Sequence, residues 1–136
     1  FKQTLKKMED KKFNSVAWFE IYVDDMERAT KFYETVMNVK LADMPVPGDA
    51  PMKMKSFPGS EDGIGASGTL VKMDGLQAGG NSTIVYFGCY DCAVEESRVV
   101  AAGGTIHQPK MSIGEYGFCS IIMDSEGNTI GLYSMN

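Results

Sequence analysis

The chain has 136 residues, the length of one small domain. Hydrophobic residues make up 43% and charged residues 23% of it, close to the globular average, which disfavours a disordered chain or a coiled coil. Thirteen Lys and Arg against eighteen Asp and Glu give a formal net charge of −5, so we expect no nucleic-acid partner. No apolar run reaches the roughly 18 residues of a membrane span, so we expect no membrane partner.

Residues 1–15 are predicted to be a solvated N-terminal lead-in, because their lysines are interrupted by Glu9 and Asp10. They also lack the apolar stretch of a secretory signal. The three cysteines are an odd number, which argues for a reducing compartment rather than a disulfide framework. We therefore expect a cytoplasmic protein.

The first half of the chain is predicted to form a strand, a helix and three more strands. Residues 16–23 (VAWFEIYV) are aromatic and β-branched, which is typical of a buried strand. Asp24 and Asp25 are N-cap candidates for a helix over 26–37, and Glu27 completes a possible capping box from Asp24. The further strands are expected over 39–44, 53–57 and 68–73.

The second half shows the same order of elements. A strand is expected over 83–90 (TIVYFGCY), then an N-cap at Asp91, a helix over 93–102 and a helix end at Gly104. The turn 125–128 contains Gly127, which suits a positive φ. The remaining strands are expected over 105–108, 117–124 and 129–134.

The two helices repeat at one offset. Asp25 and Asp91 are 66 positions apart, and so are Gly104 and Asn38, a candidate left-handed C-cap. We therefore predict an α+β fold of two βαβββ modules that form a curved mixed sheet around a cup, with the helices on the outer face. The single domain spans residues 16–136, with modules over about 16–74 and 82–134.

Alternation along the first strand of each module assigns the two sides. One side of the opening strand is wholly apolar and is expected to carry the helix, while the other places a carboxylate between two aromatic rings and suits the wall of a cup. The helix-facing set is Phe19, Ile21, Val23, Val85, Phe87 and Cys89, and the cup-facing set is Trp18, Glu20, Tyr22, Ile84, Tyr86 and Gly88.

Three segments carry a family resemblance: FEIYVDDMERATKFYETVMNVKL, AAGGTI and IGEYGFCSIIMDSEGNTIGLYS. Over about residues 16–134 they resemble the vicinal oxygen chelate superfamily of glyoxalases, bleomycin-resistance proteins and extradiol dioxygenases. The resemblance implies paired βαβββ modules and a homodimer, with modules pairing either within or between chains.

The resemblance also implies where a metal ion would be held in metal-using members. The corresponding positions here are Trp18, Ile84, Gly131 and a position near Gly68, and none of these side chains binds a divalent cation. The chain has a single His, His107. We therefore predict no metal and no cofactor.

Glu20 is the leading candidate site residue. A carboxylate in an aromatic cup could act as a general base or bind a cationic group. The alternative is a buried Glu satisfied by Tyr, backbone or a basic partner. Trp18, Tyr22 and Tyr86 could stack on a ligand or hold a cation, although such strand aromatics also serve simple packing.

Glu115 and Tyr116 lie in a loop flanked by Gly114 and Gly117, which could fold over the cup mouth or be merely solvated. Four methionines near the first module's loops could adapt to varied ligands or simply fill the core: Met44, Met52, Met54 and Met73.

Three other motifs are given structural interpretations. Cys89 and Cys92 form a CxxC without a second pair for zinc. Gly63–Gly68 spells GxGxxG, but a strand is expected to follow it, whereas a dinucleotide site needs a helix there. A Ser-His-Asp triad would have to use His107, which has no positional support.

Three functions remain open. The leading hypothesis is a metal-independent protein that binds a small molecule, cationic or polar-aromatic, in the cup. The second is a lyase, isomerase or dioxygenase-like enzyme in which Glu20 and Glu115 act as acid and base or as non-standard metal ligands. The third is an accessory module with a vestigial cup that binds a protein partner.

Overall fold

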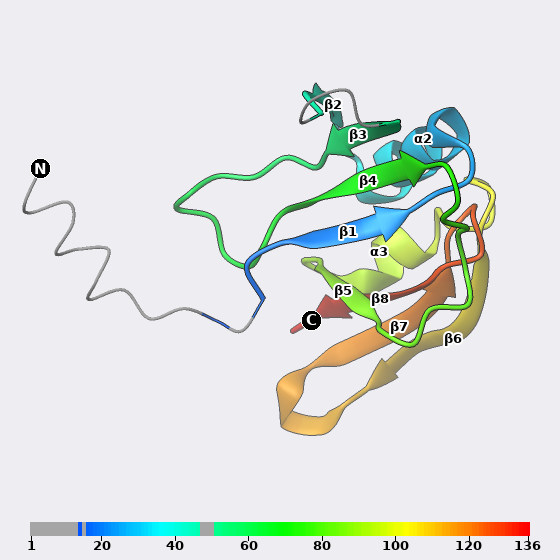
Figure 1. The fold of residues 1–136 in the computed structure, drawn as a ribbon. Coiled ribbons are helices and arrows are strands. Elements are labelled where there is room, and N and C mark those ends of the chain that lie inside the picture. The colour runs from blue at the N-terminus through cyan, green and yellow to red at the C-terminus, as the bar shows by residue number, and fades with distance from the viewer. Residues whose placement is uncertain (1–13, 15, 47–50) are drawn as a thin grey trace, which may run out of the picture.

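The computed structural model describes residues 14, 16–46 and 51–136, so most of the predicted lead-in lies outside the described residues. Eight strands form two four-stranded sheets, ordered β1-β4-β3-β2 and β5-β8-β7-β6 (Figure 1). The first sheet comprises β1 (Phe19–Tyr22), β2 (Ala42–Met44), β3 (Met52–Ser56) and β4 (Gly68–Met73). The second comprises β5 (Val85–Gly88), β6 (Thr105–Ser112), β7 (Phe118–Met123) and β8 (Thr129–Ser134).

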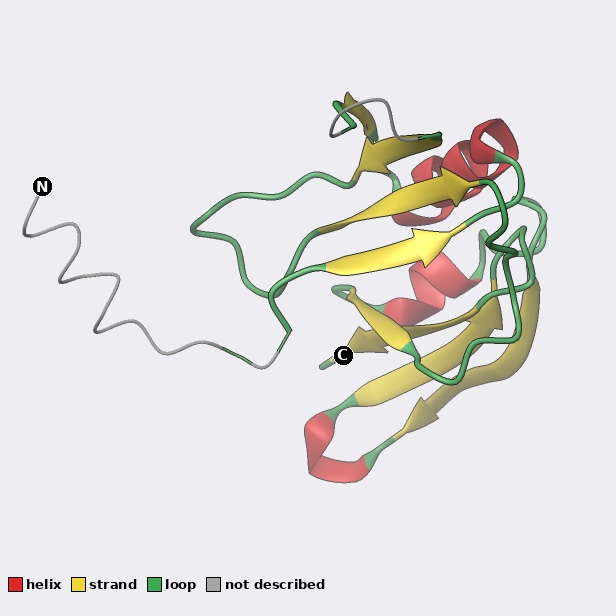
Figure 2. Cartoon of the chain, viewed as in Figure 1, coloured by secondary structure: helices red, strands yellow, loops and turns green. Residues whose placement is uncertain are grey.

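Each sheet is one βαβββ module. Helix α2 (Met26–Met37) follows β1 and helix α3 (Cys92–Glu96) follows β5, while a short 3-10 helix, η1 (Gly114–Tyr116), joins β6 to β7. The opening strand of each module pairs in parallel with its last strand, and all other pairs are antiparallel. The predicted α+β fold of two βαβββ modules is confirmed, with two separate sheets in place of one continuous sheet. In Figure 2 both helices lie behind the strands.

Helix α2 has the predicted bounds. Asp25 is its N-cap, and its side chain accepts a hydrogen bond from the Arg28 N–H. Asp24 instead accepts from the Ala78 N–H, so the predicted capping box from Asp24 to Glu27 is wrong. Asn38 ends the helix with φ 54°, the predicted left-handed C-cap.

Helix α3 is shorter than predicted. Asp91 is its N-cap, but regular α-helix ends at Glu96 and the chain continues to residue 103 in turns. Hydrogen bonds to the third residue back tighten this stretch, as from Val99 N–H to Glu96. The left-handed residue at its end is Gly103 with φ 103°, not Gly104, so the left-handed ends of the two helices are 65 positions apart.

Gly104 is required by a close approach between the modules. A Cβ there would overlap the Met123 carbonyl and the ring of Phe32 on α2. Phe32 itself is fully buried in a core that draws residues from both modules, including Leu70, Val99 and Leu132. The two modules therefore share one core. No helix of the described residues is long and apolar enough to cross a membrane.

Candidate functional site

The two sides of β1 are as predicted. Ile21 and Val23 are 5% and 1% exposed, and Phe19 packs against the core. On the opposite side Trp18 is 44% exposed and Glu20 is also exposed. We call the side of each sheet that carries Glu20 or Tyr86, turned away from the helices, the open face.

Glu20 is held by Tyr22 on the open face of the first sheet. The Tyr22 hydroxyl donates to Glu20 Oε1 at 3.0 Å, and this hydrogen bond, with some burial, raises the pKa of Tyr22. No Lys or Arg of the described residues forms an ion pair with Glu20. Within the described residues, Glu20 is therefore an exposed carboxylate that a ligand can reach, and not a buried Glu neutralised by a basic partner.

Thr69 lies directly opposite Glu20 on β4, and Ser56 lies opposite Thr69 on β3. Paired residues share a face, so this row belongs to the open face. Thr69 is fully buried, and its hydroxyl has no hydrogen-bond partner among the described residues. Buried hydroxyls usually have a partner, so this hydroxyl, closed off from solvent, is an exception among the described residues.

In the structure, the family's metal position that was expected near Gly68 corresponds to Thr69. A Cβ at Gly68 would overlap the ring of Phe19, so this position faces the helices. Thr69 pairs with Glu20, and Gly131 pairs with Tyr86. Glu20 and Tyr86 are 66 positions apart, which is the offset between the two modules. Thr69 is thus the counterpart of Gly131, which sequence spacing alone did not show because the loop before β4 has no counterpart of equal length.

The four methionines singled out in the sequence share the open face of the first sheet. Met44 and Met54 are cross-strand partners, and Met54 also pairs with Val71. In the next row Met52 pairs with Met73. All four are half-buried. Flexible thioethers therefore cover this face beyond Tyr22 and offer an adaptable apolar surface.

On the second sheet the open face begins with Tyr86, which is 50% exposed. Its ring lies over Gly131, and any Cβ at position 131 would overlap that ring. Ile121 pairs with Gly131 from the other side, and Ile84, before β5, is 40% exposed. This face is therefore apolar and aromatic.

Glu115 and Tyr116 lie on η1 and are exposed, Tyr116 to 67%. The Tyr133 hydroxyl donates to the Tyr116 carbonyl at 2.6 Å and ties this loop to β8. No hydrogen bond of the described residues joins Glu115 to Glu20. The structure therefore places Glu20 and Tyr22 on β1 with Trp18 just before it, and it leaves Glu115 and Tyr116 on a separate loop.

The residues at the family's metal positions do not fit a divalent cation. Trp18, Ile84, Thr69 and Gly131 supply no carboxylate or imidazole, and the Tyr86 ring fills the space that a side chain at 131 would need. Within residues 16–46 and 51–136, no three His, Cys, Asp or Glu side chains gather into a possible metal site.

The cysteine and glycine motifs have structural roles. Burial and a hydrogen bond with Glu95 raise the pKa of the Cys89 thiol, which disfavours a reactive thiolate. Cys92 is buried at the start of α3. The segment Gly63–Gly68 runs into β4 and not into a helix, as expected.

The turn Asp124–Asn128, part of the sequence resemblance, joins the second module to the first. Asp124 accepts the Tyr33 hydroxyl of α2 at 2.6 Å as well as the N–H groups of Glu126 and Asn128. Asn128 donates from its amide to the Tyr22 carbonyl at 3.0 Å. The turn therefore supports the end of β1, the strand that carries Glu20.

Glu126 reaches the start of α2. Its carboxylate accepts the N–H groups of Asp24 and Asp25 at 3.1 and 2.9 Å, and Arg28 Nε lies 2.6 Å away. Burial tends to raise the pKa of Glu126, but the hydrogen bonds from Arg28 and the backbone outweigh it and the pKa is lowered. The sequence pattern predicted this turn, but its contacts with the first module are known only from the structure.

A pocket of about 830 Å³ lies away from the open face, between α2 and the β2–β3 pair. A second, of about 420 Å³, lies in the loop 58–67. None of the predicted site residues lines either pocket. Neither of these two pockets therefore encloses part of the open face.

A sequence model of the glyoxalase/bleomycin resistance protein/dioxygenase superfamily matches residues 15–132. The chain belongs to this superfamily. Two curated relatives, from Mycobacterium bovis and Mycobacterium tuberculosis, carry the name "Putative glyoxylase CFP32". Each is 28% identical over 120 residues, which cover 88% of this chain and 45% of the relative. The chain thus spans about half the length of these relatives.

Solved structures share the fold. Glyoxalase I from Zea mays superposes with a TM-score of 0.70 at 21% identity, covering 88% of this chain and 45% of that one. A superfamily domain from Frankia sp. EAN1pec gives 0.66 at 15% identity, covering 90% and 98%. Hypothetical protein SA1046 from S. aureus gives 0.64 at 16% identity, covering 91% and 99%.

Proposed function

We propose that this chain binds a small cationic or polar-aromatic molecule on the open face, without a metal ion. The observation that carries the proposal is the exposed carboxylate of Glu20, held by Tyr22 beside Trp18 and not neutralised by a basic side chain of the described residues. A cation gains both from a carboxylate and from neighbouring ring faces.

Metal independence is part of the proposal. Its support is the Tyr86 ring above Gly131, which leaves no room for a ligand side chain at that position. Sequestration of a ligand, as in the bleomycin-resistance members of the superfamily, requires binding and no chemical step.

The single tryptophan provides the test, because Trp18 lies on the proposed site and its fluorescence reports on that site alone. We expect benzyltrimethylammonium to quench it saturably, and Glu20→Gln to weaken binding by about tenfold through loss of the charge. Glu27→Gln, an exposed carboxylate on α2, is the matched control and should bind like wild type. Equal binding by Glu20→Gln, or one tightly held metal ion per purified chain, would contradict the proposal.

A second candidate is catalysis, favoured by the glyoxylase name of the relatives and the fold shared with glyoxalase I. It would use Glu20 as base and Glu115 as acid in a lyase or isomerase reaction. It requires the η1 loop that carries Glu115 to close over Glu20. A Glu115→Gln variant with full turnover on an identified substrate would dismiss this role.

We also propose a cytoplasmic homodimer. The methionine rows of the open face stay partly exposed in a single chain, and the curated relatives are about twice as long, as two copies would be. The three cysteines are free, which supports a reducing compartment. Light scattering coupled to size-exclusion chromatography gives the oligomeric state directly, and a monomer at micromolar concentration would argue against the dimer.

A further inference from the structure

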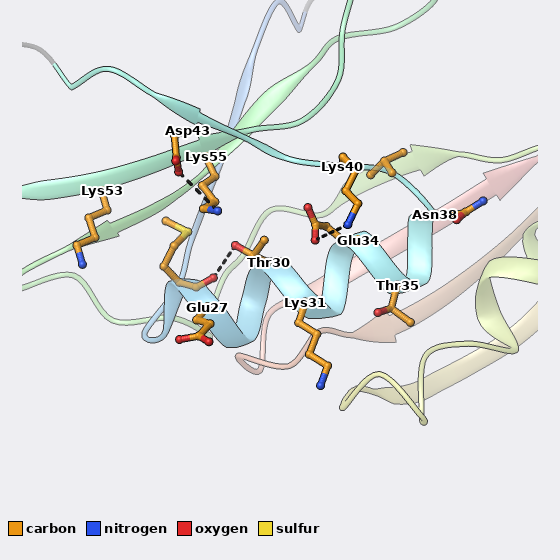
Figure 3. A pocket seen from close by; sticks show the side chains of 12 residues that line it. Glu27, Thr30, Lys31, Glu34, Thr35, Asn38, Lys40, Asp43, Lys53 and Lys55 are labelled. Carbon is orange, nitrogen blue, oxygen red and sulfur yellow. Dashed lines mark hydrogen bonds and ion pairs between the residues drawn. The ribbon is translucent and has the colours of Figure 1, made fainter.

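The 830 Å³ pocket between α2 and the β2–β3 pair arises from the alternation of β3 (Figure 3). The strand reads MKMKS, and its methionines lie on the open face. Lys53 and Lys55 therefore face the helix side, where Lys55 pairs with the fully buried Leu70. Burying charged side chains is unfavourable, so this part of the sheet does not pack tightly against α2, and a polar pocket remains between them.

The acidic groups of this pocket are largely engaged. Asp43 Oδ1 lies 3.5 Å from Lys55 Nζ, and Glu34 Oε1 lies 3.9 Å from Lys40 Nζ. Glu34 also accepts the Leu41 N–H at 2.9 Å. The remaining acid of the lining, Glu27, is one helical turn before Lys31, where opposite charges attract weakly.

Three of the described basic side chains have no ion-pair partner among the described carboxylates. Of the eight Lys and Arg that the structure describes, five form ion pairs with described carboxylates. The other three are Lys31, Lys53 and Lys72. Lys31 and Lys53 line the pocket, and Lys72 stands directly opposite Lys53 on β4.

The pair Lys53–Lys72 is unfavourable for the fold alone. Directly opposed residues of antiparallel strands have their Cβ atoms about 4.5–5.5 Å apart, and like charges there destabilise the sheet. Asp74, just after β4, forms no ion pair with either lysine. An anion between the two ammonium groups would convert this repulsion into attraction.

We propose that a compact small-molecule polyanion binds at the sheet side of this pocket, between Lys53, which lines it, and Lys72 opposite, with Lys55 beside them. Ammonium groups act as point charges and bind phosphate and carboxylate groups alike. The site lies on the helix side of the first sheet, opposite the open face, so it is separate from the proposed function. A chain with a net charge of −5 would otherwise have little affinity for such a ligand.

Inorganic pyrophosphate and malonate are the probes, titrated calorimetrically into the whole chain at low ionic strength. We expect saturable binding that Lys53→Gln and Lys72→Gln each weaken by about tenfold, while Lys110→Gln, whose lysine lies in the second module and is paired with Asp91, stays within about twofold of wild type. Tighter binding of pyrophosphate would assign the site to phosphates, and tighter binding of malonate to carboxylates.

A second measurement does not depend on the ligand. Without an anion, Lys53→Gln should raise Tm, because it removes the like-charge pair, and pyrophosphate should raise the Tm of wild type but not of this variant. The proposal would be overturned by equal pyrophosphate binding in wild type and Lys53→Gln, or by equal stabilisation from sodium chloride at matched ionic strength.

Discussion

Tyr33 brings a hydroxyl into the contact between the two modules. The side chain is 1% exposed, and its hydroxyl donates to Asp124 Oδ2 at 2.6 Å. Burial and the negative charge of Asp124 raise the pKa of Tyr33 well above its usual value, so the phenol stays protonated and remains a donor.

Tyr33→Phe should therefore destabilise the chain with little change in shape. A hydrogen bond to a charged group contributes about 1.5–3 kcal/mol, and Asp124 would keep its donors from Glu126 and Asn128. Urea unfolding measures the loss. Tyr22→Phe, whose hydroxyl bonds the exposed Glu20, is the control and should change stability by less than about 0.5 kcal/mol. Equal effects of the two variants would show that the buried bond adds nothing.

The end of α2 offers a test at the level of one element. Asn38 holds φ 54° with ψ 51°, and the Val39 N–H closes the turn onto the Glu34 carbonyl at 3.3 Å. A left-handed conformation costs an ordinary L-residue roughly 1–2 kcal/mol and costs Gly almost nothing. Asn38→Ala should thus lower the free energy of unfolding by about 1 kcal/mol, and Asn38→Gly should leave it unchanged or raise it. Thermal unfolding of both variants would contradict this account if the two had the same Tm.

The two helices show what sequence patterns can and do not predict. Met26–Met37 has strong caps and regular apolar spacing, and its predicted bounds match the structure. The second helix has the same N-cap residue type, but its later residues include Val99, Val100 and two glycines, which weaken an α-helix. Its tight turns instead follow from packing against the first module, as the contact of Gly104 with Phe32 shows. That contact joins residues 72 positions apart, so the sequence around either residue does not reveal it.

The sequence predicted which side chains of β1 lie on the open face, but not how exposed each residue of that face is. Strict alternation placed Glu20 and Tyr22 opposite Ile21 and Val23, because successive Cβ atoms of a strand point to opposite sides. Alternation carries no information about how far a face is covered, so the exposure of Glu20 and the burial of Thr69 required the strand register. The pairing of Lys53 with Lys72 also depends on register, which the sequence of β3 alone does not give.

The two modules are expected to unfold together. Their shared core and the turn Asp124–Asn128 place hydrogen bonds of one module on the opening strand and helix of the other. Loss of either module would expose buried apolar side chains of both. Urea unfolding followed by Trp18 fluorescence, in the first module, and by backbone circular dichroism should therefore give one coincident transition. Two separate transitions would show that the modules are independent.

Acid should weaken this connection through Glu126. The pKa of Glu126 is lowered in the folded chain from its usual 4.5, so its ionised form stabilises the fold. This stability is fully present above pH 4.5 and is lost as the pH falls through the lower, folded pKa. Asp91, whose pKa is lowered by Lys110, acts in the same direction and leaves some acid sensitivity when Glu126 is removed.

Glu126→Gln tests this contribution. Near pH 7 the variant should be less stable than wild type by about 1–2 kcal/mol, because the ion pair with Arg28 is lost and an amide nitrogen cannot accept one of its two hydrogen bonds, while the backbone donors keep an oxygen acceptor. As the pH falls from 4.5 through the lower, folded pKa, the two unfolding curves should converge, since folded wild type then loses the same charge. Asp43→Asn removes a carboxylate whose side chain is 90% exposed and should differ from wild type by less than about 0.5 kcal/mol at every pH. A stability gap for Glu126→Gln that stays constant from neutral to acid pH would mean that the shape of this side chain, and not its charge, joins the modules.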